Sequence, residues 1–195
     1  MYKVILNETE KICRGMNVRR KVFLVLTILW MVLIFAFSAR PAEVSSEDSR
    51  SVGLLIGELF IPGFEEQSAE AQDRFAEKVD YPIRKAAHAS EYALLGLLTA
   101  GAYIAGGAAD MGNGNEKKKA DTNSKKRTSI SRGILIPWVI TTAYAATDEM
   151  HQLFVPGRSG QVSDVLLDSA GAIAGLALLG GIRFLVQRRR ENDCK

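Results

Sequence analysis

Four apolar runs alternate along the chain with segments that hold nearly all of its charged residues. A helix needs about 17 to 25 predominantly apolar residues to cross a bilayer core, and the first, second and fourth runs have that length. The third run is shorter and contains Pro137, and we extend it to Phe154 as a helix whose outer turn is polar. The pattern predicts an all-α integral membrane protein with four transmembrane helices, at residues 22–39, 86–107, 133–154 and 165–186.

Basic residues flank these runs on one side of the predicted membrane. Lys and Arg gather before the first run, between the second and third, and after the fourth, whereas residues 40–85 contain ten acids and six bases. Positive charge favours the cytoplasmic side, so both termini should be cytoplasmic and residues 40–85 and 155–164 external. A cleaved signal peptide is the alternative for the first run, but its bulky side chains, including Trp30, are more typical of an anchor.

The remaining segments complete the predicted organisation. Residues 1–21 and 189–195 should be cytoplasmic tails on either side of a transmembrane domain at 22–188. Residues 108–132 are rich in Gly, Asn, Lys and Ser without helical or strand periodicity, which predicts a disordered basic cytoplasmic loop. The net charge of +3 comes from such clusters beside apolar runs, so it indicates membrane topology rather than nucleic-acid binding.

The external segment 40–85 has an apolar helical face of its own. A weaker pattern at Phe75 and Val79 predicts a second short helix that ends before Pro82. We therefore expect two short helices at the outer membrane interface, with a re-entrant segment as the alternative. The apolar face of the first consists of Val52, Leu55, Ile56, Leu59 and Phe60.

Gly171 and Gly175 form a small-xxx-small pair in the fourth apolar run. Such spacing lets a neighbouring helix approach closely. Packing within the protein explains it adequately, and dimerisation would need other evidence.

One polar cluster lies at the external end of the second predicted span. Lys85, His88, Glu91 and Tyr92 share one helical face there. Glu91 is about 9 Å along the helix axis from Lys85, at a rise of about 1.5 Å per residue, and so reaches below the headgroups. An acid inside a span costs about 2.5 to 3.5 kcal/mol on insertion, which indicates a role for it.

A second polar cluster follows the third apolar run and is predicted at the same membrane face. Pro156 and Gly157 supply a turn between the two helices. Asp164 and Asp168 stand one turn apart at the start of the fourth span, where acids also complement the free amides of the helix. The other members are Asp148, Glu149, His151, Gln152, Arg158 and Ser159.

The two clusters together resemble the signature of the VanZ-like family. The resemblance covers about residues 22–188. Asp168 stands where Asn is common in that family, and residues 108–132 look like an insertion. The family takes its name from a protein associated with resistance to the glycopeptide teicoplanin, which implies an envelope protein but no mechanism. The matching residues are Lys85, His88, Glu91, Tyr92, Asp148, Glu149, Gln152, Arg158 and Asp164.

Three hypotheses for the clusters stay open. In the first the protein is an enzyme, with His88, Glu91, Asp148 and Glu149 as candidate catalytic acids and bases. Its candidate substrate-binding residues are Lys85, Tyr92, Gln152, Arg158 and Asp164, because Arg and Lys suit an anionic headgroup.

A metal-dependent variant of the enzyme would use His88, His151 and two acids. The chain has no compact motif such as His-x-x-x-His, and we assign neither a metal ligand nor a cofactor.

In the second hypothesis the same groups bind a lipid-linked cell-wall precursor or a glycopeptide without changing it. In the third they pair with one another and fix the packing of the four helices, because buried charges need partners in any case. Membrane lipid is the common expected partner, and a polar stripe that would indicate a transporter is missing from the sequence pattern.

Overall fold

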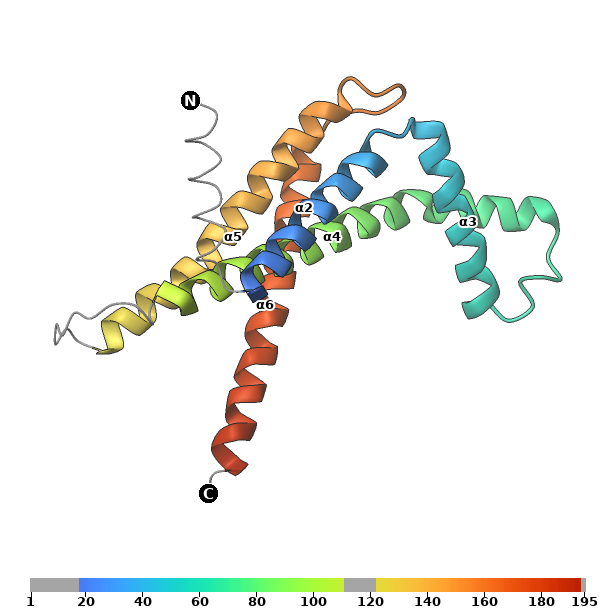
Figure 1. Ribbon diagram of the computed structural model, residues 1–195. Helices are drawn as coiled ribbons and strands as arrows, with labels where there is room; N and C mark the ends of the chain where they lie inside the picture. The colour runs from blue at the N-terminus through green and yellow to red at the C-terminus, as the bar shows by residue number, and fades with distance from the viewer. Residues whose placement is uncertain (1–17, 111–121, 194–195) are drawn as a thin grey trace.

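The computed structural model describes residues 18–110 and 122–193, and the regular structure in these residues is entirely α-helical (Figure 1). This confirms the predicted all-α class. The helices are α2 (Val18–Ser38), α3 (Ala42–Phe60), α4 (Ala69–Asp110), α5 (Thr122–Gln152) and α6 (Val162–Asp193).

Two of the described helices are long and apolar enough to cross a membrane. They are α2, of 21 residues, and the first 25 residues of α6, Val162–Val186. Both expose large apolar side chains along much of their length, such as Leu29 and Phe35 on α2 and Leu178 on α6. The predicted span 86–107 falls inside α4, and the predicted span 133–154 extends two residues beyond the end of α5 at Gln152, so the helix stops before Phe154. Neither α4 nor α5 meets the same criterion over its described residues.

Helix α4 is the central element and contacts each of the other described helices. It continues through Pro82, although the sequence pattern predicts a separate short helix that ends there. A proline inside a helix costs about 3 kcal/mol, and this part of α4 packs against α3. The Ser49 hydroxyl donates to the Asp80 carboxylate, and Val79 packs against Gly53. The second predicted interfacial helix is thus the first part of α4.

The helices also extend into the segment predicted as a disordered loop. Helix α4 runs to Asp110 and α5 begins at Thr122, so part of 108–132 is helical, while 111–121 lies outside the described residues. Lys, Arg and Ser are adequate helix formers, and extending an existing helix avoids the cost of nucleation. Composition alone therefore predicted a longer non-helical segment than the structure shows.

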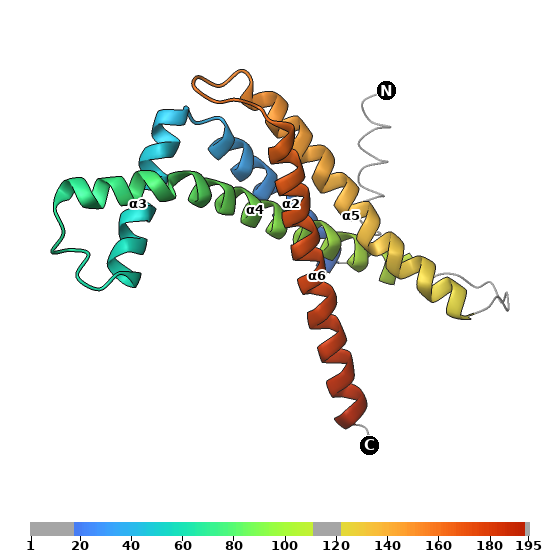
Figure 2. The ribbon, with the colours of Figure 1, turned by 180° about the vertical axis from the view of Figure 1, so that it is seen from behind.

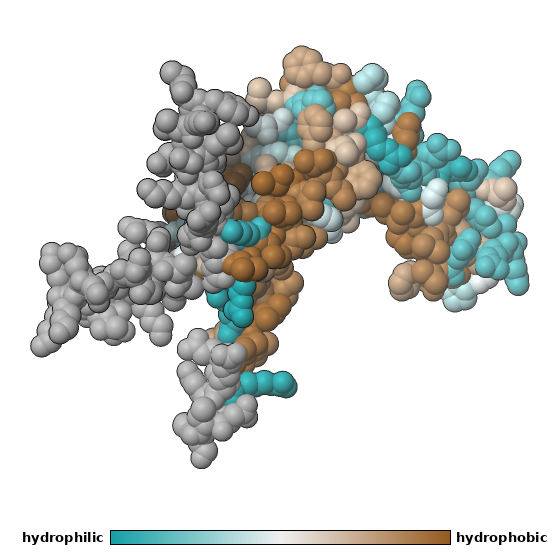
Figure 3. Space-filling model, viewed as in Figure 1, coloured by the Kyte–Doolittle hydropathy of each residue, from teal (hydrophilic) through white to brown (hydrophobic). Residues whose placement is uncertain are grey.

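Helix α3 packs on α4 through its small residues rather than through its apolar face. Gly53 and Gly57 are buried, and the Phe64 ring covers Gly57. The opposite face forms apolar surface, visible on the projecting arm in Figure 3. Its exposed members are Val52, Leu55, Leu59 and Phe60. This outward apolar face is what an interfacial helix requires.

Helices α4 and α6 cross in very close contact (Figure 2). A Cβ atom on Gly171 would lie 2.3 Å from the Ala89 carbonyl oxygen, and one on Gly175 would lie 2.0 Å from that of Ala93. Gly96 on α4 faces Ala172 in the same way. The small-xxx-small pair therefore packs inside the chain, as its spacing predicted.

Gly175→Ala should destabilise the protein, because the new methyl group would push α6 away from the Ala93 carbonyl. We expect a loss of about 1 to 3 kcal/mol, the usual range for overpacking. Gly180→Ala is the matched control on the same helix, since a Cβ atom there meets nothing within 4 Å. Thermal unfolding of both variants in detergent, followed by helical circular dichroism, tests this, and equal melting temperatures would contradict the close crossing.

Candidate functional site

The polar residues of both sequence clusters meet at one end of the helix bundle. Lys85, His88 and Glu91 lie on one face of α4, and Asp148 and Glu149 occupy the last turns of α5. Asp164 and Asp168 lie in the first two turns of α6. The close α4–α6 crossing brings the first and third groups together, because Asp168 is one turn from the contact between Gly171 and Ala89.

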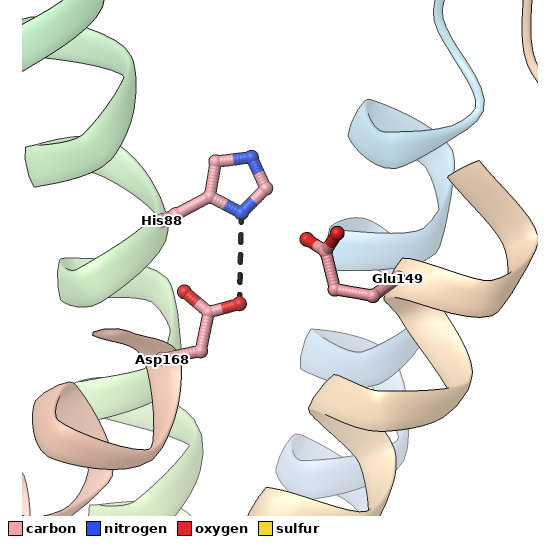
Figure 4. A group of neighbouring side chains, drawn as sticks. All are labelled: His88, Glu149 and Asp168. Carbon is pink, nitrogen blue, oxygen red and sulfur yellow. Dashed lines mark ion pairs between the residues drawn. The ribbon is translucent and has the colours of Figure 1, made fainter. Parts of the chain in front are cut away.

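The centre of the site consists of three side chains from three helices, His88, Glu149 and Asp168 (Figure 4). Their side chains point toward one another, and one nitrogen or oxygen atom from each lies within 4.8 Å of the others. His88 Nδ1 is 3.9 Å from Asp168 Oδ2, a distance too long for a hydrogen bond. We name these residues the central triplet.

The site is buried to a degree that is unusual for so many charged groups. Asp148, Glu149 and Asp168 are 3%, 4% and 0% exposed. Several of their buried polar atoms have no hydrogen-bond partner among the described residues, and the same holds for His88 Nδ1. The Tyr92 hydroxyl lies beside Asp148 but without hydrogen-bond geometry. The unpartnered carboxylate atoms are Asp148 Oδ1, Glu149 Oε1 and both oxygens of Asp168.

Glu149 is fixed by the loop that joins α5 to α6. The Gln161 backbone N–H donates to Glu149 Oε2 at 2.9 Å, which leaves Oε1 free toward the central triplet. Gly160 allows the loop to close, because a Cβ atom there would lie 2.4 Å from the Glu149 carbonyl oxygen. Asp148, the residue before Glu149, accepts a long hydrogen bond on Oδ2 from Gln152 Nε2, at 3.4 Å.

Two cationic side chains border the acids. Lys85 forms an ion pair with Asp164, and both side chains are about one-fifth exposed, at 21% and 17%. Arg158, in the loop between α5 and α6, donates from Nε to the Arg40 carbonyl at 3.2 Å. The site thus contains charge of both signs.

Burial is the main cause that lowers the pKa of the Arg158 guanidinium from its ordinary value, and the positive charge of Arg84 adds to it. Asp148, Glu149 and Glu91 act in the opposite direction. Arg158 is therefore within electrostatic range of acids from both α4 and α5.

Each of the nine residues that the sequence analysis named lies within hydrogen-bond or electrostatic range of another residue of the set, but the candidate metal group differs from the one the sequence suggested. His151 packs its ring on Phe35 of α2, with 4.5 Å between the centroids, and the central triplet contains Asp168 in its place. The position of Asp168, four residues after Asp164, was a sequence signal that Asp168 shares the helix face of the site. Acids near a helix N-terminus also have a structural explanation, because they complement the helix dipole.

The sequence analysis gave no role near the site to two aromatic residues, Trp30 and Tyr144. Trp30 of α2 donates from Nε1 to the Glu91 carbonyl at 2.9 Å, and the Tyr144 hydroxyl donates to the Met31 carbonyl at 2.6 Å. These bonds join α2 to α4 and α5. An aromatic residue within an apolar run gives no sequence signal of such a role.

A protein-family model described as VanZ/LLP1 matches residues 23–183 of the chain. The match covers the helix bundle and every residue of the central triplet, and the chain belongs to this family. Neither a curated protein nor a solved structure matches the chain.

The Lys85–Asp164 ion pair should contribute measurably to stability, because it is partly buried. In a double-mutant cycle with Lys85→Met and Asp164→Asn, we expect a coupling free energy of about 1 to 3 kcal/mol. The exposed Arg50–Asp73 pair, at 49% and 48% exposure, is the control and should give less than about 1 kcal/mol. Denaturant unfolding in detergent provides both values, and equal coupling in the two pairs would contradict the partly buried environment.

Proposed function

We propose that this chain spans the bacterial cell membrane four times, with both termini in the cytoplasm and the central triplet at the outer surface. Two observations support the proposal. In the described residues, the basic groups at the start of α2 and the end of α6 lie at the helix ends away from the site, and α3, with its exposed apolar face, lies at the site end. A polar centre buried near the outer headgroups, beside a helix that rests in the interface, is suited to reaching lipid-linked molecules.

The candidate substrate is a lipid-linked cell-wall precursor or a lipid headgroup, both of which carry phosphate. Arg158 and Lys85 supply positive charge at the rim, and the Arg guanidinium fits phosphate oxygens in a bidentate manner. His88 provides an imidazole that can transfer a proton, with Glu91, Asp148 and Glu149 as neighbouring acids. The observation that carries this proposal is the convergence of His88, buried carboxylates and Arg158 at one end of the bundle.

The alternative is a binding protein that holds the same lipid-linked group, or a glycopeptide, without reaction. The buried polar atoms that have no partner in the described residues would then be satisfied by the bound molecule. An enzyme and a binding protein differ in one observable, because only the enzyme changes the covalent structure of a bound lipid. Mass spectrometry of lipids incubated with the purified chain separates the two.

We further propose a link to teicoplanin resistance, which the family resemblance suggests. Expression in a susceptible bacterium with a single membrane should lower sensitivity to teicoplanin more than to a glycopeptide without a lipid tail. His88→Ala and Arg158→Ala should abolish the effect at unchanged protein level, measured as the minimum inhibitory concentration. Arg50→Ala, in the exposed arm, is the control and should keep it.

Two results would overturn parts of this proposal. If folded His88→Ala and Arg158→Ala variants protect as well as the original chain, the polar cluster serves the packing alone. If the original chain gives no protection, the teicoplanin link does not extend to this protein. Helix content and monodispersity in detergent establish that the variants are folded, since removing one member of a buried charge pair can cost about 3 to 5 kcal/mol.

The proposed topology predicts which positions are accessible from outside the cell. In a chain with Cys13 and Cys194 replaced by Ser, new cysteines at Ser68 and Ser159 should react with a membrane-impermeant thiol reagent in intact cells. A cysteine at Ser124 should react only after the cells are permeabilised. Labelling of Ser124→Cys in intact cells would exclude the four-span orientation.

A further inference from the structure

We propose that the central triplet, His88, Glu149 and Asp168, binds one divalent transition-metal ion. The proposal begins from geometry, because three helices that are distant in sequence each direct one ligand-type side chain to a common point (Figure 4). It does not depend on the proposed function. A chain that binds or modifies a lipid, or does neither, can hold an ion at this place.

The distances suit ligands of one ion better than they suit direct contacts between the side chains. Zinc bonds to imidazole nitrogen and carboxylate oxygen are about 2.0 to 2.2 Å long, so two ligand atoms of a tetrahedral ion are separated by about 3.4 Å. The 3.9 Å between His88 Nδ1 and Asp168 Oδ2 exceeds this value by about 0.5 Å, a gap that a small side-chain rotation closes. The limit of 4.8 Å for the whole group requires only small rotations of the side chains.

The charge balance also calls for a cation at the centre. Glu149 and Asp168 are almost completely buried, and Asp148 is close by. Lys85 pairs with Asp164, and Arg158 is within electrostatic range of Asp148 and Glu149 but forms no ion pair with Asp168 in the described residues. Buried carboxylates are costly without a counter-charge, and a divalent ion supplies two positive charges at the point where these groups meet.

The hydrogen bonds around the triplet leave the ligand atoms available. Glu149 Oε2 accepts a hydrogen bond from the Gln161 backbone N–H, while Glu149 Oε1, both Asp168 oxygens and His88 Nδ1 have no partner in residues 18–110 and 122–193. One carboxylate oxygen held by an outer hydrogen bond and the other left free is the arrangement found around metal-binding carboxylates.

The ligand set indicates the kind of ion. One imidazole with two carboxylates favours zinc, manganese or iron(II), because imidazole is a poor ligand for magnesium and calcium. Three protein ligands leave at least one coordination position for water or a substrate oxygen. An ion here would therefore be able to polarise a bound oxygen atom.

The test uses the full chain in detergent after removal of metals with a chelator. Titration with Co²⁺, which has visible d–d absorption, and with Zn²⁺ should show one ion per chain and a higher melting temperature, because a ligand that binds the folded state stabilises it. His88→Gln and Asp168→Asn should weaken binding at least about tenfold and remove the stabilisation, in line with the loss of a coordinating group. His151→Gln and Asp73→Asn are matched controls outside the triplet and should bind as the original chain does.

Asp168→Asn keeps the shape of the side chain and removes one buried negative charge, so it should fold without metal at least as well as the original chain. Failure to bind metal is then not a failure to fold, provided that the metal-free melting temperatures agree. The proposal is overturned if the original chain binds no metal at one ion per chain, if folded Asp168→Asn binds as tightly as the original, or if His151→Gln loses binding as well.

Discussion

The close crossing of α4 and α6 is the constraint on which the site depends. Gly171 and Gly175 place the α6 backbone against the carbonyl groups of Ala89 and Ala93, a separation that no larger side chain permits. His88 stands one residue before Ala89, and Asp168 stands three residues before Gly171. The contact that joins the two helices therefore also sets the distance between the imidazole and the carboxylate.

Burial at this crossing determines the chemistry that the site can support. Acids that water would otherwise solvate are enclosed by α4, α5 and α6, so each needs a hydrogen-bond donor, a cation or a proton. The surrounding structure supplies some of these, through Gln161 for Glu149 and Lys85 for Asp164. Neither oxygen of Asp168 has a hydrogen-bond donor in the described residues. Because the Asp168 carboxylate still needs a partner, a bound ion or polar ligand explains the site better than packing alone.

The sequence allowed prediction of the helical class, the two polar clusters and the close packing of the glycines, because each rests on local spacing. The apolar length of α2 and α6 and the shared face of Lys85, His88 and Glu91 are features of this kind. The helical course through Pro82 was not predictable, since it depends on contacts with α3. The central place of Asp168 and the separation of His151 were missed for a related reason. Helical spacing shows which residues share a face, but the rotation of each helix against its neighbours comes only from packing.

The loop between α5 and α6 connects the site to the arm formed by α3 and the first part of α4. Its backbone fixes Glu149 through Gln161, and it carries Arg158, whose Nε donates to the Arg40 carbonyl in the segment before α3. A further bond runs from the Ala42 backbone N–H to the Pro156 carbonyl at 3.2 Å. Helix α3, which directs its apolar residues outward, is thus hydrogen-bonded through the segment before it and its first residue to the loop that holds Glu149. The same loop therefore joins a helix suited to the membrane interface with a carboxylate of the central triplet, because both are hydrogen-bonded to its backbone or side chains.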